Sequence, residues 1–348
     1  MSLQGWPLLV VSIMLALGCP AACVLFWGRA RGRGALPARL SLILACQTTA
    51  ILAVAVSVND HYQFFASWSD LTGQNGAGAP IMQPGDGGPL RMRERFRPAG
   101  GHDILEATLI GARSGIRGDV WVWLPPEYRR QPHARFPVVE LFTGFPGTPN
   151  TWFHAMEGPA KLEQAIRDRA AQPYILVAPT ITVEPGHDTE CTDVPGGPKV
   201  ATWLTEDVRR AVVDDFRTRP GRDAWGAMGY STGGYCAAKL PVQYPRLFGA
   251  GVSLAGYFSP FTAALAKVPG QNLPLLLRQR HPPVHLLLAT SRQDPGTAGA
   301  IATMVKAARP PTLISTYVVP RGGHNTGVWT AMLPKCFQWL TATLARAR

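Results

Sequence analysis

A serine flanked by glycines is the strongest chemical signal in the sequence. Residues 229–233 read GYSTG; the apolar run AWGAM precedes them and a helix-like stretch, GYCAAKLPVQY, follows. A serine on a sharp strand-to-helix turn exposes its hydroxyl, and the flanking glycines avoid clashes within that turn. The first amides of the following helix also point at a developing oxyanion. This placement predicts that Ser231 is a nucleophile for acyl chemistry.

Two residues further along the chain could complete a catalytic triad with this serine. In α/β-hydrolases the orienting acid and then the histidine base follow the serine in sequence. Asp294 comes just after the apolar run VHLLLA, and His324 comes just after LISTYVV. Each therefore follows a predicted strand, at the edge where open α/β sheets place their sites. We expect His324 to take the proton from Ser231 and Asp294 to hold the histidine in the correct tautomer.

The other histidines fit the role of the base less well. His281 and His285 lie around the start of a predicted strand, which is its wrong end. His154 and His187 fall in loops that could reach a cleft, but both precede the serine in sequence. His324 follows two glycines at the expected strand end, and this position favours it as the base.

A serine hydrolase also needs two amides that stabilise the oxyanion. One should be the amide of Thr232, directly after the nucleophile, and the other should come from the loop after an early buried strand. That loop reads TGFPG at residues 143–147, and Phe145 is the expected donor. Trp152 and Trp329 are candidates for lining the acyl or alcohol site, with packing in the core as the equally common alternative.

Strand-like and helix-like segments alternate along residues 99–348. Predicted strands cover about 104–110, 119–124, 136–144, 174–178, 224–229, 250–254, 284–289 and 313–319. Predicted helices cover about 158–171, 202–217, the stretch after Ser231, 297–308 and 328–346. This alternation predicts an α/β fold with a mostly parallel sheet covered on both faces, which begins with a hairpin of its first two strands. No Gly-x-Gly-x-x-Gly follows a strand, so nothing supports a dinucleotide-binding fold.

Four stretches together resemble a known family. They are GYSTGG at 229–234, TGFPG at 143–147 followed by Trp152, VWLPPEY at 122–128, and GGHNTGVW at 322–329. They are similar to an esterase family of α/β-hydrolases that includes mycobacterial mycolyltransferases, S-formylglutathione hydrolases and enterochelin esterases. The resemblance covers roughly residues 100–345, and it implies the same triad and the same oxyanion amides, those of Phe145 and Thr232. Members often carry His-Gly or Asp-Gly in the oxyanion loop, where this chain has Thr143-Gly144.

These features predict a serine esterase or acyltransferase that works through an acyl-enzyme on Ser231. The expected substrate is an acyl-ester lipid or a small ester, and the acceptor is water, a sugar or another alcohol. The alternative is a non-catalytic, membrane-anchored binding protein with the same fold. Such a protein would be expected to lack a triad member, whereas this chain has all three.

Two uncharged runs near the N-terminus, at residues 6–27 and 40–58, are each about long enough to cross a membrane. The connector GRARGRGALPAR carries four arginines and no acid, so it should be cytoplasmic and both chain ends should lie outside. A cleaved signal peptide is the alternative, but no basic segment precedes the first run. The expected domains are a two-helix transmembrane anchor at 1–60, a juxtamembrane segment with a Gly/Pro-rich linker at 61–98, and an extracytoplasmic catalytic domain at 99–348.

The formal net charge of +12 points to a membrane rather than to nucleic acid. Nucleic-acid binding would require this charge gathered on one face with aromatic residues interleaved. The visible arginine clusters, at residues 29–39 and 91–97, instead flank the anchor. The positive-inside rule and lipid headgroups account for such clusters.

The cysteines predict one disulfide. Cys191 lies in a long loop after the strand at 174–178, which is expected to neighbour the nucleophile strand, and Cys236 lies in the helix behind Ser231. An extracytoplasmic domain permits a disulfide, so this pair should join the loop to the active site, with free buried thiols as the alternative. No cysteine pair has a metal-ligand spacing, and neither a metal nor another cofactor is predicted.

Overall fold

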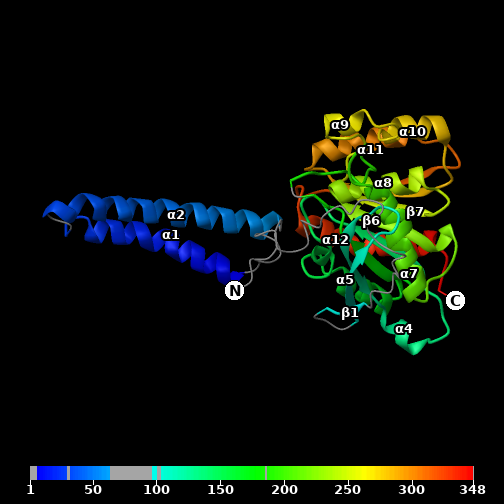
Figure 1. Ribbon diagram of the computed structural model, residues 1–348, viewed down its shortest axis with the longest axis horizontal. Coiled ribbons are helices and arrows are strands. Elements are labelled where there is room, and N and C mark those ends of the chain that lie inside the picture. The colour runs from blue at the N-terminus through cyan, green and yellow to red at the C-terminus, as the bar shows by residue number, and fades with distance from the viewer. Residues whose placement is uncertain (1–5, 30–31, 63–95, 100–102, 185, 348) are drawn as a thin grey trace. The chain divides into compact units, whose positions relative to one another are not determined.

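The computed structural model describes residues 6–29, 32–62, 96–99, 103–184 and 186–347. By its internal contacts the chain divides into two units, Met1–Asn75 and Gly76–Arg348, whose elements are labelled in Figure 1. Most of the predicted linker at 61–98 lies outside the described residues. The two units are therefore described separately.

The N-terminal unit consists of two apolar helices that pack against each other. They are α1 (Trp6–Phe26) and α2 (Ala35–Tyr62), with a short 3₁₀ turn, η1 (Gly32–Gly34), between them. Their segments Pro7–Phe26 and Ala35–Asn59 are long and apolar enough to cross a membrane, and few of their residues are buried. Large apolar side chains such as Leu17, Val24 and Ile51 are exposed on the outside of the pair. The two helices are candidate membrane spans.

The C-terminal unit is built on a nine-stranded sheet in the order β1-β2-β3-β5-β4-β6-β7-β8-β9. The strands are β1 (Arg97–Pro98), β2 (Ile104–Ile110), β3 (Arg117–Trp123), β4 (Val138–Phe142), β5 (Ile175–Pro179), β6 (Trp225–Tyr230), β7 (Ala250–Leu254), β8 (His285–Ser291) and β9 (Leu313–Val319). The first strands pair antiparallel, and β2 and β3 form the predicted hairpin. From β5 to β9 every pairing is parallel. The predicted mostly parallel α/β sheet is confirmed.

The order of the strands corrects one expectation. β5 was expected to neighbour β6, the strand that precedes Ser231, but β4 lies between them. Val138 of β4 is opposite Ile175 of β5 on one side and Trp225 of β6 on the other. β4 leads into the predicted oxyanion loop, so this order brings that loop directly beside the end of β6. The long loop after β5 therefore passes the end of β4 before it reaches the helix behind β6.

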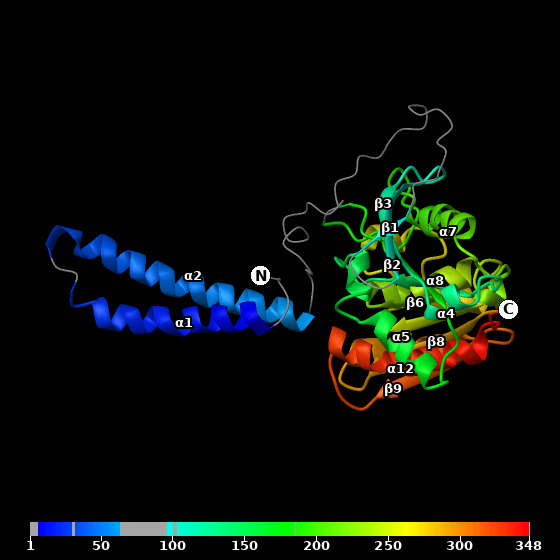
Figure 2. The same cartoon turned by 90° about the horizontal axis from the view of Figure 1, so that it is seen from below.

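Helices cover both faces of the sheet (Figure 2). The longer ones are α5 (Gly158–Arg167), α7 (Arg209–Asp215), α8 (Thr232–Gln243), α10 (Leu273–Arg280), α11 (Pro295–Ala307) and α12 (Thr326–Thr343). Shorter ones are α4 (Pro126–Arg130), η2 (Pro149–Trp152), α6 (Val200–Thr202), the π-helical η3 (Trp203–Val208), η4 (Arg222–Ala224) and α9 (Ala263–Ala266). The helix predicted at 202–217 is thus a run of α6, η3 and α7, and α10 was not predicted.

Alternate residues of the buried strands explain how the two faces are covered. On β4, Val139 and Leu141 belong to a core that includes α5 and α12, which contact each other. Val138 and Phe142, on the opposite face, belong to a core that includes α7 and α8. Side chains of a strand alternate between faces, so a continuous apolar strand requires helices on both sides. Because β4 and β6 to β9 pair in parallel, their carboxyl ends lie along one edge of the sheet.

Candidate active site

Ser231 lies on a sharp turn at the carboxyl end of β6. Its backbone has φ 56° and ψ −122°, a left-handed conformation that a residue with a side chain rarely adopts. Its amide donates to the carbonyl of Leu254, and α8 begins at the next residue. A Cβ at Gly229 or Gly233 would collide with backbone atoms. The glycines are therefore required by the turn that exposes the Ser231 hydroxyl.

Three side chains that are distant in sequence lie in hydrogen-bond contact at this edge. The Ser231 Oγ lies 3.0 Å from His324 Nε2, and His324 Nδ1 lies 2.7 Å from Asp294 Oδ2. The Asp294 side chain is only 12% exposed and that of His324 is 42% exposed. With its proton on Nδ1, the imidazole donates to the carboxylate and leaves Nε2 free to accept from the serine. The structure thus brings together the residues that sequence analysis selected.

The loops that carry the acid and the base are tied to each other. Asp294 follows β8 and its amide donates to Ser291, while the Gln293 side chain accepts a hydrogen bond from the Gly322 amide in the loop before His324. Asn325 then caps α12 by accepting from the Val328 amide. Gln293 was not selected from the sequence. Only its position next to Asp294 could have indicated that Gln293 links the two loops.

The predicted oxyanion loop passes directly beside Ser231. A Cβ added at Gly144 would lie 3.1 Å from Ser231 Cβ, so the loop backbone runs close to the serine. The Gly147 amide donates to the Gly144 carbonyl and closes the loop. Among the described residues, the amides of Phe145 and Thr232 make no hydrogen bond. Both amides are available as donors next to Ser231.

The two tryptophans expected to line the substrate site lie beneath it. Trp152 is fully buried and Trp329 is 5% exposed. Their rings pack on Tyr230, at centroid distances of 5.5 and 4.7 Å, and Trp329 also packs edge-on against His324. Both rings thus support the turn at Ser231 through Tyr230, and Trp329 alone also supports the His324 ring. A contact of either ring with substrate stays a prediction.

Comparisons with known proteins identify the family. A model of the family described as "Putative esterase" matches residues 113–340. The chain belongs to this esterase family.

The sequence comparison adds a distant relative of this esterase. An uncharacterized protein of Corynebacterium glutamicum is 23% identical over an alignment of 258 residues, and the match covers 68% of this chain and 60% of that protein. The chain thus spans less than two thirds of the length of the curated relative that it matches.

Solved structures of other esterases share the fold. A ferulic acid esterase matches with a TM-score of 0.61 at 17% identity, over 70% of this chain and 98% of that one. An S-formylglutathione hydrolase from Agrobacterium tumefaciens matches with 0.60 at 15%, over 72% and 99%. The enterobactin esterase of Shigella flexneri matches with 0.52 at 17%, over 70% and 61%. At these identities the likeness establishes the α/β-hydrolase fold.

The esterase contains the disulfide expected between Cys191 and Cys236. The two Cα atoms are 5.8 Å apart and 45 residues separate the cysteines in sequence. Both residues are buried, with Cys236 on α8 and Cys191 in the loop after β5. The disulfide therefore joins that loop to α8, the helix that begins directly after Ser231.

A buried lysine on α8 holds the same loop. The Lys239 ammonium donates to the Glu190 carbonyl at 2.5 Å and, at 2.9 Å each, to Thr192 Oγ1 and Gln271 Oε1. Burial lowers the pKa of Lys239 to about 7, and the nearby carboxylates oppose that decrease. Sequence analysis missed this residue because Lys239 is one lysine within an apolar helix and all three partners come from distant loops.

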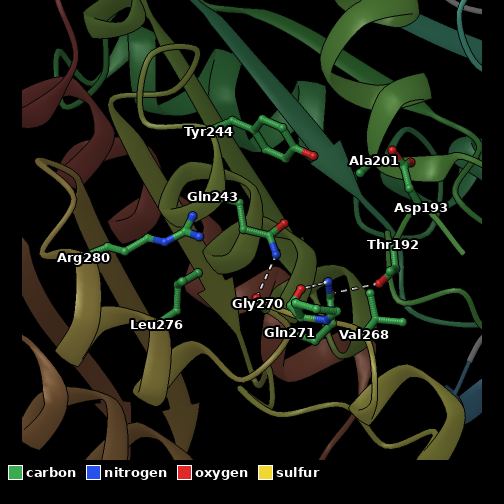
Figure 3. Close-up of a pocket in the computed structure, with 11 residues that line it drawn as sticks. Thr192, Asp193, Ala201, Gln243, Tyr244, Val268, Gly270, Gln271, Leu276 and Arg280 are labelled. Carbon is green, nitrogen blue, oxygen red and sulfur yellow. Dashed lines mark hydrogen bonds between the residues drawn. The ribbon is translucent and has the colours of Figure 1, made fainter. Parts of the chain in front are cut away.

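A cavity of about 370 Å³ lies toward the C-terminal end of α8 (Figure 3). Its lining includes Thr192 and Gln271, the partners of Lys239, together with Gln243, Tyr244 and Arg280. Ser231 is not among its lining residues, so the cavity is distinct from the candidate active site. Within the part of the chain that the structure describes, no group of His, Cys, Asp or Glu side chains is arranged to hold a metal ion.

Proposed function

We propose that the protein is a serine esterase that transfers an acyl group to Ser231 and then to water or to an alcohol. The observation that carries the proposal is the hydrogen-bonded series Ser231, His324 and Asp294 at the carboxyl edge of the sheet. The sharp turn at Ser231 and the two unpaired amides beside it support the same reaction.

The geometry suggests a role for each group. His324 Nε2 takes the proton of Ser231 as its Oγ attacks the ester carbonyl, and Asp294 stabilises the imidazolium that forms. The oxyanion accepts hydrogen bonds from the amides of Phe145 and Thr232. His324 then returns the proton to the leaving alcohol, and an acyl-enzyme remains on Ser231. Water or a second alcohol, deprotonated by His324, then attacks the acyl carbonyl, and Ser231 Oγ leaves with the proton that His324 returns.

Trapping the acyl-enzyme tests this function. The full chain in detergent micelles, mixed with an acyl ester and quenched in acid, is expected to carry one acyl group on the peptide that contains Ser231. The same reaction with glycerol or a sugar present should yield a new ester if alcohols act as acceptors, and only free acid if water alone does. Mass spectrometry measures both products. An acyl group on another residue, or none on a turning-over enzyme, would refute the mechanism.

We also propose that α1 and α2 anchor the enzyme in a membrane with the catalytic unit outside the cytoplasm. Both helices are long and apolar enough to span. The connector between them is basic, which favours the cytoplasmic side. The Cys191–Cys236 disulfide suits an oxidising compartment.

Protease treatment of intact cells tests this topology. We expect a soluble, active fragment to be released by cleavage between residues 73 and 90, because that segment would be exposed outside the cell. Active-site labelling of the medium, with a cytoplasmic marker protein as the control for lysis, measures the release. A fragment that appears only after the cells are broken would show the opposite orientation.

A further inference from the structure

The hydroxyl of Thr232 is held from two directions by residues of two other loops. Thr232 Oγ1 donates to Asp188 Oδ2 at 2.7 Å and accepts from the Tyr257 hydroxyl at 3.2 Å. The Thr232 side chain is 6% exposed, so water has little access to compete for these bonds. Asp188 follows β5 and Tyr257 follows β7, and Ser231 lies at the end of β6.

We propose that Asp188 and Tyr257 are positioning residues for the acyl-transfer reaction of Ser231. By holding the Thr232 hydroxyl, they keep the Thr232 backbone amide aimed at the developing oxyanion. This inference rests on the proposed function, because it assigns a purpose to contacts around the proposed oxyanion hole. It requires that Asp188 and Tyr257 are themselves firmly held.

Asp188 is held by its own loop. Its Oδ1 accepts from the Glu190 amide at 2.8 Å, and both Glu190 and Cys191 have positive φ angles near 50°. The disulfide to α8 and the Lys239 bond to the Glu190 carbonyl secure this tight turn. Burial raises the pKa of the Asp188 carboxyl, and the hydrogen bonds from Thr232 and Glu190 oppose that rise. The acceptor of the Thr232 hydroxyl is thus part of a cross-linked turn.

Tyr257 is held from the other side. Its ring stacks on that of Tyr235, at a centroid distance of 4.9 Å, and meets Phe261 edge-on. The buried Glu190 carboxylate accepts from the amides of Phe261 and Thr262, so the loop after β7 is fastened to the loop after β5. Burial raises the pKa of Tyr257, which keeps its hydroxyl protonated as a donor. Both contacts of Thr232 therefore come from one connected structure.

The bonds to the Thr232 hydroxyl matter because the backbone next to Ser231 sets the direction of the Thr232 amide. Ser231 adopts a strained conformation, and the peptide plane between Ser231 and Thr232 sets the direction of the donor amide. The Ser231 carbonyl of that peptide accepts from the Tyr235 amide of α8, and the Thr232 hydroxyl adds bonds to two other loops. Removing an oxyanion donor costs about 10²–10³-fold in rate, and misaligning one costs less. We expect about a 10-fold loss of kcat when the Thr232 hydroxyl is removed.

Matched substitutions separate the hydroxyl from the bulk of the side chain. Thr232→Val keeps the shape and removes both hydrogen bonds, and it should lower kcat and the fluorophosphonate labelling rate about 10-fold with KM nearly unchanged. Thr232→Ser keeps the hydroxyl and should retain at least half of wild-type kcat. Asp188→Asn leaves one acceptor oxygen for two donors, the Thr232 hydroxyl and the Glu190 amide, and should lower kcat less than Asp188→Ala does. Asp188→Ala should lower kcat about as much as Thr232→Val does. The double variant Asp188→Ala/Thr232→Val should be no slower than either single variant.

A second buried threonine provides the control for stability. Thr312 is 3% exposed and donates to the Pro282 carbonyl, at the opposite end of β9 from His324. Thr312→Val should lower the melting temperature as Thr232→Val does, but leave kcat unchanged. Any of three results would overturn this inference and leave the proposed function standing. They are a Thr232→Val enzyme with kcat within twofold of wild type, a Thr232→Ser enzyme as slow as Thr232→Val, and additive effects in the double variant. Failure of wild type to label at Ser231 would overturn the proposed function together with it.

Discussion

Ser231→Ala is expected to lower ester turnover by at least about 10⁴-fold and to abolish labelling by fluorophosphonates. The substitution removes the hydroxyl oxygen that is proposed to carry the acyl group, and the turn already accommodates the Cβ that remains. His324→Ala should cost nearly as much, because the serine and the base act as a unit. Turnover of a chromogenic ester and gel-based labelling measure both effects.

Ser259→Ala is the matched control for this experiment. Ser259 is an exposed serine in the loop after β7, where its hydroxyl accepts from the Asn272 side chain and not from a residue of the triad. This variant should keep wild-type turnover. Circular dichroism should show the same unfolding transition for Ser231→Ala and the wild type. More than a few per cent of activity in a folded Ser231→Ala or His324→Ala protein would refute the triad assignment.

Loss of the Cys191–Cys236 disulfide is expected to have the second-largest effect. Replacing both cysteines by alanine should lower the free energy of unfolding by about 4 kcal/mol, because the bond closes a 45-residue loop in the unfolded chain. For a domain of this size that is a decrease of roughly 10 °C in melting temperature. Turnover should also fall, because the cross-linked loop carries Asp188, the partner of Thr232. Calorimetry and ester turnover measure the two effects.

A reducing agent separates this bond from other effects of the substitution. It should lower the melting temperature of the wild-type protein and leave that of the double alanine variant unchanged. Cys336 is a buried free thiol and provides no alternative target for reduction. A non-reducing digest that returns the Cys191 and Cys236 peptides as separate free thiols would contradict the disulfide.

Local sequence patterns were sufficient to select the three side chains that the structure brings together, those of Ser231, His324 and Asp294. The turn at Ser231 depends on neighbouring glycines and on the change from an apolar strand to a helix, all within a few residues. Asp294 and His324 could be selected because parallel strands end at one edge, so residues after two such strands are brought together without any knowledge of strand order. The apolar runs at 6–27 and 40–58 needed only their length.

Other features depended on contacts that no local pattern encodes. β5 proved to lie one strand further from β6 than expected, yet the disulfide forms because the long loop after β5 spans that distance. α10 was not predicted, and one continuous helix was predicted where α6, η3 and α7 follow one another.

By itself, the sequence determined the fold class, the apolar N-terminal helices and which side chains meet at Ser231. The tertiary structure decided what surrounds them: Asp188 and Tyr257 on the hydroxyl of Thr232, and Lys239 between two loops. The physical reason is the range of the interactions. Periodicity and strand-end position repeat within a segment and are visible in one chain. A hydrogen bond between loops depends on how far each loop reaches, and only packing sets that distance.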